Sequence, residues 1–399
     1  MIPFRLLFSG RSGAVRPQPG DRPTQLHQAR LAPRWVLVLG VALIAGACGD
    51  SSASPSAGST DELSAEERCE ANQAAGTVTY VSSFDFAAAA SILDVLVAEA
   101  EGYFEEVCLD VEIQAGQAPS NGTIVATGNA QFSSAGSFGE LVNTNVQGNT
   151  DLVAIAHYGK TAVQALVVPG DSPVTELADL NGTTIGVKGD MPLPIQAMLA
   201  QGGVDRSTLT EPALSGFDPV AHLELGIDAL PVYKTNEPAQ LDAAGIEYRM
   251  FDPLDFDVPT SFAVFFTNQA FLDEHPTAVE DFVRASFKGF AFSVDNPDVA
   301  VGHALERLDA AGNQFFLTAE GEQFRWLVES ALVLDTTPSG QGVGVLDVDR
   351  LGAEIELLTE VGVFATEPDW RSMVAEDVAA GLYDGTTLLE SGVRADGDG

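Results

Sequence analysis

Strand-like and helix-like segments alternate along the chain from residue 77 onwards, and this alternation restricts the fold more than any other feature of the sequence. The strand-like segment TVTYVSS (77–83) is followed by a helix-like block at 87–106. Further strand-like segments follow at 109–116, 130–136, 152–159, 164–170, 183–189, 227–233, 246–251 and 261–268, after which helical patterns dominate. Strands that alternate with helices form βαβ units, so we predict an α/β fold with a mainly parallel sheet.

The carboxyl ends of the predicted strands hold most of the candidate binding residues. In parallel α/β sheets these ends form the ligand crevice, because helix N-termini and free backbone N–H groups meet there. We therefore predict ligand contacts from these residues at the strand ends: Ser83, Phe84, Asp85, Ser134, Gly136, Ser137, Tyr158, Lys188, Asp190, Tyr233, Asn236 and Glu237.

The segment GIDALPVYKTNEP (226–238) ends in a cluster of polar and aromatic side chains between a strand and a helix. One interpretation is structural: Thr235 or Asn236 caps the helix, Glu237 interacts with the positive helix end, and Pro238 is tolerated in the first turn. Capping does not account for Tyr233 at the strand end. We therefore predict that at least one of Tyr233, Asn236 and Glu237 contacts a ligand.

The first 47 residues differ from the rest of the chain. They contain six arginines against the single acid Asp21, and they end in a 13-residue apolar stretch at 35–47. That stretch is too short to span a bilayer as a helix but suits the apolar region of a secretory signal. Small residues then lead to Cys48, a pattern that resembles the bacterial lipoprotein signal, in which this cysteine is acylated; an ordinary secretory signal is the alternative.

Residues 48–76 are expected to form a disordered tether, because they are rich in Ser, Ala, Gly and acids and have few large apolar side chains. A short tail at 393–399 is expected to be disordered as well. Two cysteines remain, Cys69 and Cys108. In an exported protein an even remainder favours a disulfide, with two buried unpaired thiols as the alternative.

The chain is strongly acidic, with a formal net charge of −38 that becomes about −43 once the signal is removed. Such a field repels nucleic acid and anionic membrane surfaces, so neither is an expected partner. It is compatible with a neutral or cationic ligand and equally with a solvated surface adapted to salt.

Four segments resemble one protein family in the same order along the chain. They are AEAEGYFEEVCLDVEI (98–113), ATGNAQFSSAGSFGEL (126–141), ELADLNGTTIGVKG (176–189) and the corner 226–238. They are similar to the binding proteins of ABC importers, in the branch that includes pyrimidine-precursor, riboflavin, alkanesulfonate and nitrate binders.

The resemblance implies a two-lobed periplasmic-binding-protein fold of type 2, with a ligand cleft between the lobes. On that basis lobe 1 takes 77–167, lobe 2 takes 168–263, and 264–392 returns to lobe 1 with the C-terminal helices. It also implies a monomer, anchored by lipid on the extracytoplasmic face of the membrane, that delivers a small molecule to an ABC permease and its ATPase.

Two classes of ligand follow from the candidate residues. A nitrogen heterocycle, such as a thiamine-pyrimidine precursor or a flavin, would match Asn236 and Glu237 and would stack on Tyr158 and Tyr233. A small anion, such as an alkanesulfonate or nitrate, would match Lys188, which lies before a predicted helix N-terminus. We favour the heterocycle because a carboxylate in a desolvated cleft penalises an anion.

Enzyme and cofactor patterns are missing from the sequence. There is no G-x-S-x-G elbow, no nucleotide-binding glycine loop, and no metal-ligand spacing among the five histidines. We therefore predict a protein that is not an enzyme and that needs no cofactor or metal. An exported enzyme or sensor subunit on the same fold is the alternative.

The lipid-anchor hypothesis predicts that Cys48 becomes the acylated N-terminus of the mature protein. Cys48→Ala is expected to move the protein from the membrane fraction to the soluble fraction and to stop cleavage at this bond, because acylation precedes that cleavage. Fractionation and N-terminal mass mapping would measure both effects. Equal membrane association with unchanged cleavage would contradict the hypothesis.

Overall fold

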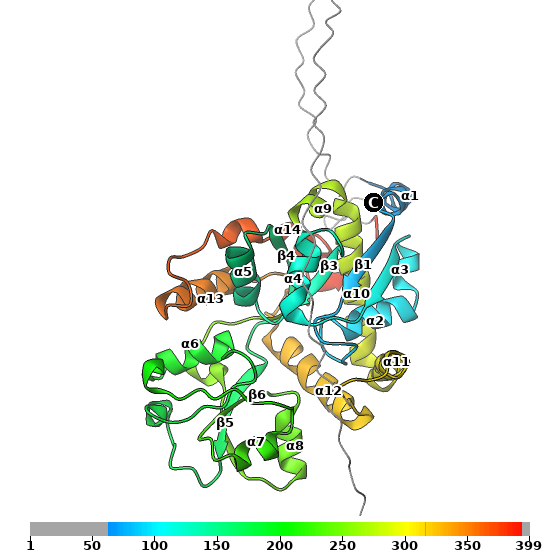
Figure 1. The fold of residues 1–399 in the computed structure, drawn as a ribbon. Helices are drawn as coiled ribbons and strands as arrows, with labels where there is room; N and C mark the ends of the chain where they lie inside the picture. Colours follow the sequence, from blue (N-terminus) through cyan, green and yellow to red (C-terminus); the bar gives the residue numbers. More distant parts are fainter. Residues whose placement is uncertain (1–62, 316, 393–399) are drawn as a thin grey trace, which may run out of the picture. The chain divides into compact units, whose positions relative to one another are not determined.

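A computed structural model describes residues 63–315 and 317–392 (Figure 1). The predicted signal 1–47, Cys48, and the tail 393–399 lie outside the described residues. In the described ranges, none of the helices combines the length and the apolar character that crossing a bilayer requires.

The first sheet has five strands in the order β2-β1-β3-β8-β4. They are β1 (Thr77–Val81), β2 (Asp110–Gln114), β3 (Phe132–Ala135), β4 (Leu152–Gly159) and β8 (Phe262–Asn268). β1 pairs in parallel with β2 and β3, as the alternating pattern predicts. β8 lies between β3 and β4 and is antiparallel to both, so the sheet is mixed.

The second sheet has three strands in the order β6-β5-β7. They are β5 (Gln164–Pro169), β6 (Leu230–Tyr233) and β7 (Tyr248–Phe251), and both pairings are antiparallel. The prediction of a mainly parallel sheet is wrong here, because β6 and β7 each pair with β5 in the opposite direction. The segment expected as a strand at 183–189 contributes isolated parallel bridges, such as Ile185 with Ala229.

Two segments connect the sheets: one runs from β4 to β5, and the other leads into β8. All of β5 pairs in the second sheet, beginning with Gln164 opposite Tyr233. The predicted lobe boundary at 167/168 is therefore wrong, because it cuts a continuous strand. The chain also rejoins the first sheet at Phe262, slightly before the predicted residue 264.

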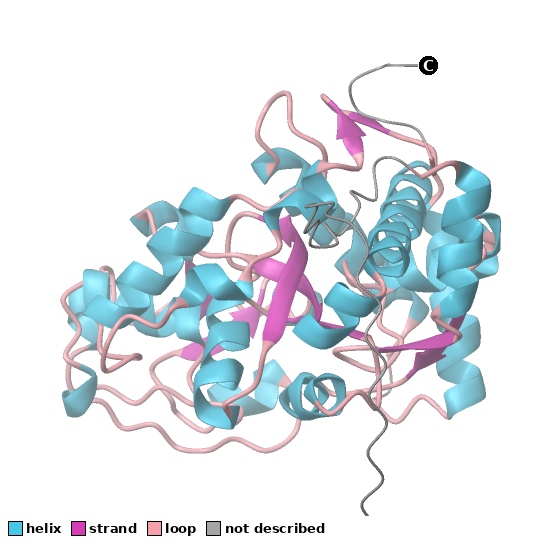
Figure 2. Cartoon of the chain, turned by 90° about the horizontal axis from the view of Figure 1, so that it is seen from above, coloured by secondary structure: helices cyan, strands magenta, loops and turns pink. Residues whose placement is uncertain are grey.

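Helices surround the strands, as Figure 2 shows. The helices are α2 (Leu93–Ala100), α3 (Tyr103–Glu106), α4 (Ala118–Ala126), α5 (Phe138–Gly148), α6 (Leu193–Gln201), α7 (Pro219–Glu224), α8 (Glu237–Ala243), α9 (Gln269–Glu274), α10 (Pro276–Asp295), α11 (Pro297–Ala311), α12 (Ala319–Thr336), α13 (Val348–Glu360) and α14 (Glu376–Ala380). A short hairpin of β9 (Tyr383–Asp384) and β10 (Thr387–Leu388) follows.

Aromatic packing joins α10 to the first sheet. The ring of Phe282 stacks on Phe132 of β3 at a centroid distance of 3.9 Å and on Phe104 of α3 at 5.4 Å. All three side chains are buried. α10 also packs along α2 (Figure 1), so a long amphipathic helix from the later part of the chain completes the core around β1 and β3.

An additional helix, α1 (Ala65–Ala74), precedes β1, so the predicted disordered tether over 48–76 is wrong for these residues. Ser64 and Glu67 form a capping box at its start. Arg68 then donates to buried Asp281 of α10 at 3.0 and 3.1 Å. Composition did not reveal this helix because it docks through polar contacts rather than through an apolar face. Cys69 of α1 forms a disulfide with Cys108.

Asp281 is the centre of this buried network, because it also accepts from Asn72 at 2.8 Å and from Arg284 at 3.0 Å. Asp281→Asn would remove the buried carboxylate that Arg68 and Arg284 share, while Arg68 keeps its ion pair with Glu280, so we expect the free energy of unfolding to fall by about 3–5 kcal/mol. Denaturant titration would measure this. Glu106→Gln, which breaks an exposed pair with Lys288, serves as the control and should cost about 0–1 kcal/mol. Equal effects of the two substitutions would contradict the account.

Candidate functional site

The loop after β1 brings predicted residues of two neighbouring strands together. Ser134 of β3 donates a hydrogen bond to Ser83 Oγ at 3.0 Å. The backbone of Asp85 is left-handed, with φ 45°, and its N–H donates to Gly116 O at 3.0 Å. Phe84 is half-buried at the same turn. The ends of β1 and β3 therefore form one surface, as parallel pairing requires.

Helix α12 holds this loop from the other end of the sequence. Glu322 accepts from the backbone N–H of Ala88 at 2.6 Å, and Glu329 accepts from that of Ala90 at 2.7 Å. Arg325, between them on the same helix face, donates from Nε to Glu322 at 3.2 Å. None of these three residues was predicted from the sequence. Their spacing along one helix face is the only sequence signal for them, and it does not identify the loop that they bind.

The turn between β3 and α5 is built from local contacts. Ser137 caps α5 by accepting from the N–H of Glu140 at 3.2 Å, and the N–H of Gly136 donates to the Glu140 carboxylate at 3.1 Å. A Cβ atom at position 136 would lie 2.6 Å from that carboxylate, so a larger residue would displace the Glu140 side chain from the N–H of residue 136. Gly136 and buried Ser137 thus have structural roles in this conformation.

At the polar corner after β6, Glu237 is almost fully buried and occupied by contacts of the protein itself. It accepts from the N–H of Tyr233 at 2.9 Å and forms an ion pair with Lys188. Lys188 and Glu237 therefore neutralise one another. Asn236 makes no side-chain cap, which excludes it as the cap of α8 in this structure; its Oδ1 accepts from Gln240 at 3.0 Å instead. Asp190 is exposed.

Tyr233 lies where elements of both sheets meet. Its side chain is 46% exposed, although charged groups from several elements act on it. Desolvation raises the pKa of Tyr233 to about 12; Glu140 of α5 and Glu237 of α8 add to the rise, and Arg325 of α12 opposes it. Helices α5 and α12 belong with the first sheet, and Tyr233 with the second. Tyr233 therefore lies near elements of both lobes, and its contact with a ligand stays a prediction.

Three aromatic rings form a cluster that joins the loop after β1 in the first lobe to the second lobe. Phe84, from the loop after β1, lies 4.9 Å from Phe315, which precedes α12. Phe315 meets Phe217, which precedes α7 in the second lobe, at 6.1 Å in an edge-to-face arrangement. Phe217 is 59% exposed. An exposed ring beside two others is suited to stack a flat ligand. Only Phe84 was predicted from the sequence.

Tyr158 is not a binding-site residue in this structure, and its prediction as a stacking wall is corrected. It is fully buried, its ring stacks on Phe290 at 4.9 Å, and its hydroxyl donates to Asp94 at 2.6 Å. Every residue of β4 is buried, because both faces of this strand are covered. The end of a strand that is covered on both faces supplies core side chains rather than ligand contacts.

Several buried polar groups near the connecting segments have no hydrogen-bond partner among the described residues. They are the ammonium of Lys160 and the hydroxyls of Thr161, Thr235 and Thr260. Desolvation lowers the pKa of Lys160 to about 8, and the Arg350 charge contributes to the decrease, while Asp347 opposes it.

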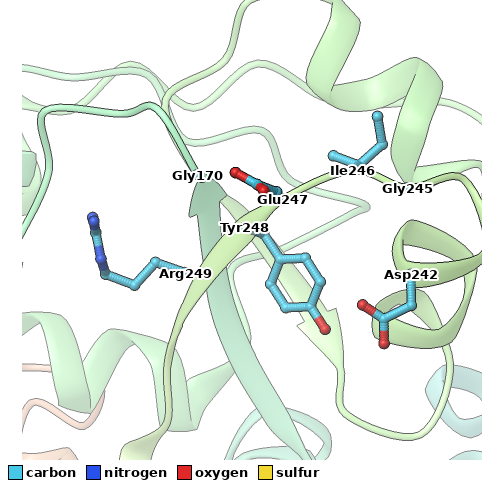
Figure 3. A pocket seen from close by; sticks show the side chains of 7 residues that line it. All are labelled: Gly170, Asp242, Gly245, Ile246, Glu247, Tyr248 and Arg249. Atoms are coloured by element: carbon cyan, nitrogen blue, oxygen red, sulfur yellow. The ribbon is translucent and has the colours of Figure 1, made fainter.

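An open depression in the second lobe lies apart from these residues (Figure 3). It is lined by Gly170, Asp242, Gly245, Ile246, Glu247, Tyr248 and Arg249. None of the predicted site residues lines it. Within residues 63–315 and 317–392, no group of three or more His, Cys, Asp and Glu side chains is placed to hold a metal ion.

Comparison with known proteins gives matches over most of the described chain. The family described as NMT1/THI5-like matches residues 89–300. A formylaminopyrimidine-binding protein of Halalkalibacterium halodurans is 25% identical over 305 residues, which are 72% of this chain and 85% of that protein. The riboflavin-binding protein RibY of Chloroflexus aurantiacus is 26% identical over 290 residues, 69% of this chain and 79% of that protein.

Among solved structures, the periplasmic aliphatic sulphonate binding protein SsuA from Escherichia coli aligns with a TM-score of 0.56 at 14% sequence identity. The alignment covers 79% of this chain and 94% of that structure. At this identity the likeness shows the fold alone, and the predicted periplasmic-binding-protein fold is confirmed.

Three buried carboxyl groups predict a pH-dependent stability. Desolvation raises the pKa values of Asp94, Glu329 and Glu354 to about 7. Their pKa values are higher in the folded chain than in the unfolded chain, so the folded state binds more protons between about pH 4 and pH 7. The free energy of unfolding should therefore fall as pH rises through this window.

We expect a higher melting temperature at about pH 5 than at about pH 8, and a smaller difference in Glu354→Gln. Differential scanning calorimetry would measure both. Glu356→Gln, at an exposed position of the same helix α13, is the matched control and should keep the wild-type difference. An unchanged pH difference in Glu354→Gln would show that this carboxyl is not among the groups responsible.

Proposed function

Because the chain belongs to the NMT1/THI5-like family, we propose that it is the extracytoplasmic solute-binding component of an ABC importer. It captures a planar nitrogen heterocycle, such as a thiamine-pyrimidine precursor or a flavin, between its two lobes. Its two curated relatives are named for binding a formylaminopyrimidine and riboflavin, which supports a ligand of this class.

The observation that contributes most to this proposal is the aromatic cluster of Phe84, Phe315 and Phe217. It joins the loop after β1 to the second lobe, and the exposed ring of Phe217 leaves one face open for stacking. Tyr233 is also exposed, and it lies where elements of the first and second lobes meet. Aromatic walls of this kind favour a flat ring over a tetrahedral sulfonate or a nitrate ion.

We further propose that the protein acts as a monomer anchored by an acyl chain at Cys48, and that it passes the unchanged ligand to a permease with its ATPase. Nucleic acid has no place in this function, because the strong negative charge repels it. No catalytic chemistry is proposed.

The second candidate, a small-anion binder, depends on Lys188. The ion pair between Lys188 and buried Glu237 disfavours it, because the ammonium is already neutralised by a neighbouring carboxylate.

Titration calorimetry with riboflavin and with a formylaminopyrimidine tests the proposal. Phe217→Ala should weaken binding of the ring compound by about 2- to 10-fold, since an aromatic pair contributes about 0.5–1.5 kcal/mol beyond area burial. Leu225→Ala, at a 69% exposed position of the same lobe, is the control and should bind as wild type.

Alkanesulfonates, titrated in parallel, provide the opposing outcome. Tight sulfonate binding that is abolished by Lys188→Ala but indifferent to Glu237→Gln would reject the heterocycle and favour the anion. Conversion of the ligand to a new species during the titration would reject the receptor and favour an enzyme.

A further inference from the structure

The guanidinium of Arg325 in α12 is buried, and some of its N–H donors have no acceptor among the described residues. The residue is 8% exposed, and its hydrogen bonds run from Nε to the Glu322 carboxylate. Among the described residues, its two Nη groups make no hydrogen bond. A guanidinium is planar, so the bond at Nε also fixes the direction in which the Nη donors point.

The surroundings place Arg325 at the proposed binding site. Its partner Glu322 accepts from the N–H of Ala88, in the loop that carries Phe84. The charge of Arg325 also acts on the hydroxyl of Tyr233, which belongs to the second lobe. Arg325 therefore lies between the loop after β1 and the corner after β6, the two segments that the proposed ligand would contact.

The carboxylates of α12 and of the corner after β6 already accept hydrogen bonds, whereas buried Asp85 Oδ1, in the loop after β1, has no partner among the described residues. Glu322 accepts from Ala88 N and from Arg325, Glu329 accepts from Ala90 N, and Glu237 binds Lys188 and Tyr233 N. Donors remain. They include the Nη groups of Arg325, and the hydroxyl hydrogen of Ser83, whose oxygen accepts from Ser134. A ligand that satisfies them has to supply acceptor atoms.

Building on the proposed function, we propose that Arg325 is a specificity-determining residue. It selects the ligand by donating hydrogen bonds to acceptor atoms on one edge of the ring. The preferred ligand is then an oxo-substituted heterocycle, which offers carbonyl oxygens on one edge, rather than an amino-substituted one. A carbonyl oxygen has two lone pairs and can accept from both Nη groups of a fixed guanidinium, whereas an amino group at the same ring position is a donor. Glu322 and Glu329 are positioning residues, because they hold Arg325 and the loop in place.

A matched pair of ligands tests the edge preference: pyrimidine-2,4-diones and 2,4-diaminopyrimidines with the same substituents, together with riboflavin, which has a dione edge. In calorimetry, wild type should bind the oxo member at least about 10-fold more tightly, as expected for hydrogen bonds to a charged group. Arg325→Gln should lose that preference, and Arg325→Lys should retain part of it because a lysine supplies charge without the planar fork.

Arg206→Gln is the control, since Arg206 lies in the second lobe and pairs with Glu211 rather than with a residue of the loop after β1. It should bind as wild type. The double variant Glu322→Gln/Arg325→Gln removes the buried carboxylate left behind by Arg325→Gln. If neither variant folds, the preference of the wild-type protein for the oxo or the diamino ligand is the measurement that tests the inference.

A wild-type preference for the diamino member, or an unchanged preference in Arg325→Gln, would overturn the inference while leaving the heterocycle function intact. Binding of alkanesulfonate in preference to every ring compound would instead overturn the proposed function itself. The two failures are therefore distinguishable.

Discussion

The pairing of β8 between β3 and β4 is the constraint on which the rest of the structure depends. β8 bonds to both neighbours in the antiparallel direction, and nearly all of its side chains are buried. Because the chain leaves the first sheet after β4 and must return to place β8 between β3 and β4, the second sheet is attached by two connecting segments. Elements of the two sheets consequently meet at the strand ends, where Tyr233 and Phe84 lie.

Buried ion pairs are the second feature that holds the structure together. Each of three such pairs fixes the position of one segment. Asp281 and Arg68 attach α1, Glu322 and Arg325 hold the loop after β1, and Glu237 with Lys188 fixes the corner after β6. Such pairs contribute little net stability, because desolvation offsets the attraction, but removal of one partner leaves a costly buried charge. Their role here is to fix the positions of these segments.

The sequence was sufficient to predict the α/β class, the resemblance to binding proteins and the positions of Ser83 and Ser134 at strand ends. These depend on local periodicity and on the rule for parallel strand ends. The prediction for Tyr158 from the sequence was wrong. In a strand that is covered on both faces, polar and apolar residues do not alternate, so the sequence does not show which side chains reach solvent. It also misplaced the lobe boundary inside β5, since strand pairing across sheets leaves no local signal.

The contributions of α12 and Phe217 could not be predicted for a different reason. Arg325 and Phe315 lie more than 200 residues from the loop after β1, and only the folded chain brings them together. Likewise, the pairing of Lys188 with Glu237 joins residues whose separate patterns had suggested opposite ligands. Long-range contacts of this kind decide the chemistry of the site.

Native mass spectrometry of the purified protein, before and after denaturation, tests most directly that the chain is a receptor for a planar heterocycle. The account predicts one bound nitrogen heterocycle per chain, released on denaturation with the same mass as the compound supplied. Retention of an alkanesulfonate, or release of a chemically altered species, would contradict it.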